Sequence, residues 1–154
     1  MKRFASRWNT LQRIAEQRKR IAEFELLREQ QTQRQIAERK RQLTEENNQQ
    51  CNTLKRTIGE TVSSHLLIAE RGAIEIQFSS IESLGREAHE LNEAIMGLQS
   101  EWTTRMRDEE RAQTMLNRDR EEYHREVSSA EQLEIEETAR AIDLAKRVRE
   151  QKAT

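Results

Sequence analysis

The stretch IESLGREAHELNEAIMGLQSEW, residues 81–102, decides the fold of this chain. Every seventh residue from Ile81 to Trp102 is apolar, and a leucine follows three positions after each of the first three of them. Alternating steps of three and four residues are typical of a helix that buries a narrow apolar stripe against another helix. The seven-residue step continues along the chain, and the predicted seam consists of Ile81, Ala88, Ile95, Trp102, Leu116, Tyr123 and Leu144.

Composition limits the fold class. Of the 154 residues, 36% are charged and 34% are hydrophobic, and proline is absent. Globular domains usually contain about 45–50% apolar and about 25% charged residues, so this chain lacks the apolar content of a compact enzyme domain or a β-sandwich. Because no proline interrupts the helical pattern, we expect an all-α protein whose apolar residues form a seam.

A weaker helical segment precedes the strong one. Steps of seven from Trp8 pass through Ala15, Ala22 and Ile36, with polar residues between them. Gly59 and a cluster of hydroxyl residues follow, and Ser and Thr favour helix caps over helix interiors. The pattern predicts a single domain over residues 1–154, with helix 1 at about 3–56, a turn at about 57–64 and helix 2 at about 65–150. The predicted fold class is an elongated antiparallel two-helix coiled-coil hairpin with unequal arms.

The charges are distributed unequally along the chain. Residues 1–56 contain 14 Lys and Arg against 7 Asp and Glu, a net charge of +7, and residues 57–154 contain 13 against 21, a net charge of −8. Opposite charges on the two predicted helices favour their pairing and disfavour the pairing of each helix with its own copy. The alternative is a parallel homodimer of continuous helices.

The sequence contains few groups that point to catalysis. The three histidines lie 24 and 35 residues apart, and no HExxH, CxxC or phosphate-binding glycine loop is present. We expect no enzyme activity, no cofactor and no metal site. The single cysteine, Cys51, permits no internal disulfide and fits a reducing compartment. The longest apolar run has four residues, so we expect neither a signal peptide nor a membrane span.

Two groups of residues are candidates for partner binding. The basic start includes Arg13, Arg18, Lys19 and Arg20, interleaved with apolar residues at helical spacing. Such a segment suits an acidic protein surface, a lipid surface or nucleic acid, or it is simply a solvated basic face opposite the acidic helix. We favour the solvated face or an acidic protein partner, and we expect no nucleic-acid partner. The second group is Ile76 and Phe78. Phe78 is expected to share the apolar stripe with Ile74 and Ile81. Because Ile76 points away from that stripe, it is expected to be exposed, which indicates either a docking surface or a short third helix packed there.

The order of these features resembles the central-stalk proteins of bacterial type III secretion, the SctO/YscO group with FliJ as its flagellar relative. The similarity consists of a basic amphipathic start, a glutamine-rich first helix, a break of small residues and a longer second helix. Locally it is strongest from Glu101-Trp102 to Tyr123-His124-Arg125-Glu126, followed by the acidic run Glu131–Glu137. The apolar stretch at 66–84 departs from the pattern of the group.

The resemblance implies a monomeric, non-enzymatic stalk in the bacterial cytoplasm, at the cytoplasmic face of the inner membrane. Such a hairpin would enter the pore of the hexameric secretion ATPase and contact the export gate protein, and it could also handle secretion chaperones. From their expected exposure, and not from motif positions of the group, the four basic residues are candidates for the ATPase pore, and Ile76 and Phe78 are candidates for contact with the gate or a chaperone. The alternatives are a homodimeric coiled-coil scaffold with a lipid- or nucleic-acid-binding start, and a secretion chaperone.

Overall fold

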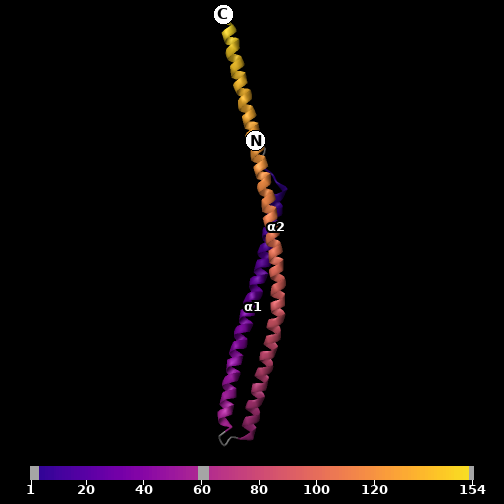
Figure 1. Ribbon diagram of the computed structural model, residues 1–154, viewed down its shortest axis with the longest axis vertical. Helices are drawn as coiled ribbons and strands as arrows, with labels where there is room; N and C mark the ends of the chain where they lie inside the picture. Colours follow the sequence, from indigo (N-terminus) through magenta and orange to yellow (C-terminus); the bar gives the residue numbers. More distant parts are fainter. Residues whose placement is uncertain (1–3, 59–62, 153–154) are drawn as a thin grey trace. The chain divides into compact units, whose positions relative to one another are not determined.

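The structure is a computed structural model that describes residues 4–58 and 63–152. It contains two helices, α1 (Arg7–Thr57) and α2 (Ser64–Lys152), of 51 and 89 residues, and the described residues contain no strand (Figure 1). At 1.5 Å per residue these helices are about 76 and 133 Å long. The prediction of an all-α chain with two long helices in contact is confirmed.

Capping sets the helix boundaries. The Ser6 hydroxyl accepts a hydrogen bond of 3.1 Å from the Trp8 N–H, as an N-cap serine does, so α1 begins at Arg7 and residues 4–6 precede it. The start expected near residue 3 lies outside the described residues. At the other break, the Ser63 carbonyl accepts hydrogen bonds from the backbone N–H groups of Leu66 and Leu67 as α2 begins. Within the predicted turn, residues 59–62 also lie outside the described residues.

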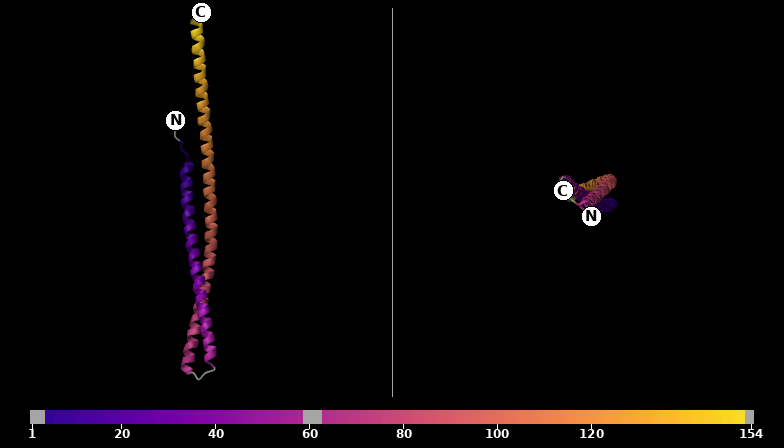
Figure 2. Two further views of the ribbon diagram at one scale, coloured as in Figure 1. Left: turned by 90° about the vertical axis from the view of Figure 1, so that its left-hand side faces the viewer. Right: turned by 90° about the horizontal axis from the view of Figure 1, so that it is seen from below.

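The chain divides into two compact units, of which the first to consider is Arg18–Arg105. Here α1 and α2 lie side by side as a helical hairpin (Figures 1 and 2). A hydrogen bond joins the Gln33 amide to Asn92, and the Lys40 ammonium lies 3.5 Å from the position that a Cβ would take on Gly85. The helices are therefore in contact along much of this unit.

The interface of this unit is a stripe on each helix. On α1 the buried residues are Ala22, Ile36 and Asn47. On α2 Ile95 is buried, and the other stripe residues are half-buried at steps of three and four: Leu67, Glu70, Ile74, Gln77, Ile81, Leu84, Ala88, Leu91, Leu98 and Trp102. The steps match those of a helix packed along one side, but several of the covered residues are polar.

The other unit comprises Met1–Gln17 and Met106–Thr154. Its core consists of Ala112 and Leu116 on α2, and Trp8 of α1 is half-buried. Phe4 packs on Tyr123 with ring centroids 5.3 Å apart, and the Ser6 hydroxyl donates a hydrogen bond to the Asp119 carboxylate. Beyond Val127, every described residue of α2 is exposed. In Figure 2 this end of α2 (yellow) has no second helix beside it.

Candidate protein-interaction surfaces

The basic residues singled out in the sequence divide by exposure. Arg13, Arg18 and Arg20 are exposed on α1, whereas Lys19 is half-buried. Lys19 belongs to the seven-residue row that includes Leu26 and Gln33, both half-buried, so its side chain is partly covered along this row. The three exposed arginines present surface to solvent, where a partner could contact them.

The apolar pair on α2 is exposed. Ile76 is 71% exposed and Phe78 is 57% exposed. The expectation that Phe78 shares the apolar stripe with Ile74 and Ile81 is wrong, because steps of three and four place Gln77 at the covered position instead. Ile76 and Phe78 therefore offer apolar surface to a partner of the described chain. Ile68, 70% exposed, adds to the apolar surface of the same helix.

The predicted seam residues fall into three groups by exposure. Ile95 and Leu116 are buried, and those at 81, 88, 102 and 123 are half-buried. Leu144 is different: it is 63% exposed. In the unit that contains Leu144, α1 begins only at Arg7, and Phe4, which precedes it, packs on Tyr123. No described part of α1 therefore reaches Leu144.

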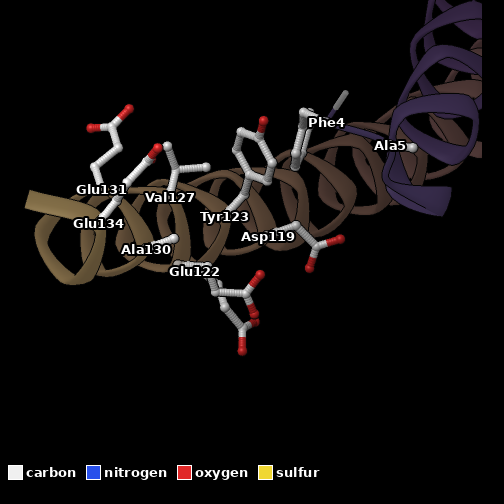
Figure 3. A pocket seen from close by; sticks show the side chains of 10 residues that line it. Phe4, Ala5, Asp119, Glu122, Tyr123, Val127, Ala130, Glu131 and Glu134 are labelled. Atoms are coloured by element: carbon white, nitrogen blue, oxygen red, sulfur yellow. The ribbon is translucent and has the colours of Figure 1, made fainter. Parts of the chain in front are cut away.

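An acidic groove in the unit of Met1–Gln17 and Met106–Thr154 escaped the sequence analysis. Phe4, Tyr123, Val127 and Ala130 provide its apolar surface, and the rest of the lining is Ala5, Asp119, Glu122, Glu126, Glu131 and Glu134. Figure 3 shows Phe4, Tyr123 and Val127 pointing to the same side of α2. The lining on α2 extends over the 16 residues from Asp119 to Glu134, about 24 Å of helix. The elongated form and the five carboxylates suit the side of a basic helix.

The seven-residue periodicity does not predict where the groove lies. Its position follows from the residue at which α1 begins, because residues 4–6 precede the helix and the Phe4 ring packs on Tyr123. The only sequence signal is Ser6, an N-cap residue just before a helical pattern. Acidic residues on one face of helix 2 would otherwise indicate a solvated surface.

Polar atoms are also covered between the helices. The side-chain oxygens of Asn47 and Gln77 and the indole Nε1 of Trp102 are buried, and none has a hydrogen-bond partner within the described residues. Covered polar groups weaken packing, and in coiled coils a single polar residue in the stripe fixes the register of the helices. The amide-rich part of helix 1 thus places polar groups inside the hairpin as well as on its surface.

Surface ion pairs are numerous and exposed. Arg71 and Glu75 lie 3.1 Å apart, and such exposed pairs contribute about 0–1 kcal/mol each. The Arg41 guanidinium donates hydrogen bonds of 3.1 and 2.9 Å to the Glu38 carboxylate. These bonds lower the pKa of Glu38 below its ordinary value of 4.5 and raise the pKa of Arg41.

A metal site and a membrane span are two further features to compare with the described residues. Across residues 4–58 and 63–152, no cluster of three or more His, Cys, Asp or Glu side chains is arranged to hold a metal ion. Neither helix contains, in its described part, an apolar stretch long enough to span a membrane. Comparison of the chain with protein-family models, curated proteins and solved structures finds no match in any of the three.

Proposed function

We propose that this chain is a non-enzymatic central stalk of a bacterial type III secretion system, which engages the hexameric secretion ATPase and the export gate. The supporting observation is the pairing of two long helices, 51 and 89 residues, in a hairpin. The sequence resemblance to the SctO/YscO and FliJ group agrees with this arrangement. In the proposal the hairpin is an antiparallel coiled coil.

The order of contacts within the units supports the antiparallel coiled coil. In the unit of Arg18–Arg105, Gln33 contacts Asn92, and the later residue Lys40 approaches the earlier Gly85. In the other unit, Phe4 contacts Tyr123 and Ser6 contacts Asp119. In each case the partner number falls as the residue number rises, and the covered residues of α2 follow steps of three and four.

The proposed stalk acts by contact and breaks no bonds. Arg13, Arg18 and Arg20 present guanidinium groups to the inner surface of the ATPase ring, where asymmetric contacts favour one state of the ring's subunits over another. Charged surfaces steer such contacts and exchange them readily. Ile76 and Phe78 provide the apolar contact for the export gate or for a secretion chaperone.

The ATPase assay is the direct test. We expect the purified protein to increase the ATP hydrolysis or hexamer formation of the secretion ATPase encoded in the same genome. Arg13→Glu with Arg18→Glu should abolish the effect, because both residues are exposed and reversal repels the acidic surface that they contact. Lys55→Glu with Arg56→Glu is the matched control, two exposed charges reversed elsewhere on α1. Lack of stimulation by saturating wild-type protein would refute the stalk.

The gate contact needs a separate test. Ile76→Ser with Phe78→Ser should remove binding to the export gate or to a chaperone in a purified pull-down, because it deletes the exposed apolar anchors. Ile135→Ser, 69% exposed on the same helix, is the control. Helicity measured by circular dichroism should be unchanged in all variants. Retained binding by the double variant would remove these two residues from the contact.

A further inference from the structure

The uncovered end of α2 carries its own apolar stripe. Residues 128–152 are exposed throughout, although Leu144 and Val148 lie on the side of the helix that continues the groove. From Tyr123 onward that side comprises positions separated by steps of 4, 3, 4, 3, 4, 3 and 4 at 100° per residue. These positions are Tyr123, Val127, Ala130, Glu134, Glu137, Ala141, Leu144 and Val148.

The charges of this end are divided between its two halves. Residues 119–137 contain eight acidic and two basic residues, a net charge of −6, and they line the acidic groove. Residues 138–152 contain Arg140, Lys146, Arg147, Arg149 and Lys152 against Asp143 and Glu150, a net charge of +3. The basic half is therefore the complement, in charge and in apolar stripe, of the acidic half beside it.

The basic half cannot fold back onto the acidic groove of the same molecule. Glu126 in the groove and Arg147 in the basic half are 21 residues apart on a helix that is continuous from Ser64 to Lys152, a separation of about 32 Å. We infer that the groove of one chain receives the basic end of a second copy, in a two-fold antiparallel contact of residues 123–148.

The spacing of the stripe permits this pairing. A sequence of steps that reads the same in both directions lets two antiparallel copies place their stripe residues in the same layers, as a two-fold interface requires. In the proposed register, the residue numbers of any two facing stripe residues add up to 271. The layers are then Tyr123 with Val148, Val127 with Leu144, Ala130 with Ala141, and Glu134 with Glu137. The contact covers 26 residues, between three and four heptads, which is the range that sustains coiled-coil pairing.

Charged residues stabilise the proposed dimer at the edges of the stripe and destabilise it at the centre. Glu126 flanks the stripe on the side where Arg147 of the second copy lies, and the two-fold axis repeats this contact. Within the described residues Glu126 has no ion pair of its own, and Arg147 has only the exposed contact with Asp143 at 3.3 Å. The glutamate layer at the centre costs stability, so the pairing is weak enough to separate when a ring with a single pore takes up one hairpin.

Two single reversals test the contact on the full chain. By sedimentation equilibrium, the wild type should change with concentration from 18.3 kDa to twice that mass. Arg147→Glu and Glu126→Arg should each weaken dimer formation by about tenfold or more, since each turns both flanking attractions into repulsions. Mixed in equal amounts, the two variants should form heterodimers, because each reversed charge then meets its opposite and the other pair is native.

Matched controls separate this contact from other associations. Lys146→Glu makes the same charge change as Arg147→Glu, but Lys146 lies on the side of the helix opposite the stripe, so this variant should leave the dimer intact. Leu144→Glu should abolish the dimer, whereas Ile142→Glu, off the stripe, should not. A wild type that remains at 18.3 kDa, a dimer insensitive to Leu144→Glu, or a mixture that fails to recover would overturn the inference. The ATPase assay is independent, so loss of the dimer with intact ATPase stimulation would leave the proposed stalk standing.

Discussion

Two stretches of the same helix α2 show what a partner helix changes. Between Leu67 and Trp102 the stripe is covered by α1, and Ile95 is 6% exposed. Between residues 128 and 152 nine of 25 residues are apolar, yet Ile135 is 69% exposed. Local sequence makes both stretches helical, because helix formation depends on nearby residues. Burial depends on whether another segment lies beside the stripe.

The largest expected effect compares isoleucines in the two stretches. Ile95→Ala should lower the free energy of unfolding by about 2–3 kcal/mol, because it deletes buried methyl groups and leaves a cavity between the helices. Ile135→Ala should change it by about 0.5 kcal/mol or less. Urea unfolding followed by circular dichroism measures both. Ile135 lies off the stripe of the proposed dimer contact, so self-association does not complicate the comparison. Equal losses would mean that the two stretches are covered alike.

A second experiment asks what polar residues do in the covered stretch. Asn47 is 4% exposed and its side-chain oxygen has no partner within the described residues. Asn47→Leu should raise the free energy of unfolding by about 1 kcal/mol, because an unpaired buried polar group costs about 1–3 kcal/mol. Asn48→Leu, exposed on the same turn, is the control and should give no gain. A loss of stability in Asn47→Leu would show that the amide is paired in solution.

The sequence predicts the helices and much of the covered face. Ala22 and Ile36, on the weak track from Trp8, are buried, and so are Ile95 and Leu116 on the strong one. This succeeds because a helix that packs along one side must repeat its covered positions at the helical period. The same logic predicts a covered Leu144, and there it fails, because periodicity does not state how far the partner helix extends.

The remaining differences arise from tertiary detail. Gln77 takes the covered position that the apolar Phe78 is expected to take from the sequence. The steps of three and four determine which positions face α1, whatever residue type occupies them. The acidic groove depends on the contact between Phe4 and Tyr123, which lie 119 positions apart in the sequence. No local pattern encodes such a contact, so the groove became visible only with the fold.

A smaller effect is expected from the glycines of α2. In the covered stretch, a Cβ on Gly85 would lie 3.5 Å from the Lys40 Nζ, an ordinary contact with a flexible side chain, and a Cβ on Gly97 would meet nothing within 4 Å. Gly85→Ala and Gly97→Ala should therefore each stabilise the chain by about 0.5–1 kcal/mol through helix propensity alone. Thermal unfolding measures both. A gain confined to Gly97→Ala would show that Lys40 is held in place.

The smallest effect on stability is expected from the exposed pair of Glu38 and Arg41, whose interaction should depend little on a neighbouring helix. Because Arg41 donates hydrogen bonds to Glu38, the pKa of Glu38 measured by NMR titration should lie below 4.5. It should return towards that value in Arg41→Gln and stay low in Arg39→Gln. A lowered folded-state pKa stabilises the fold above the unfolded pKa, and this contribution is lost as the pH falls through the folded value. Since both side chains are exposed and screened by salt, the unfolding midpoint should move less than in the variants above. A pKa of Glu38 that does not respond to Arg41→Gln would contradict the hydrogen bond as its cause.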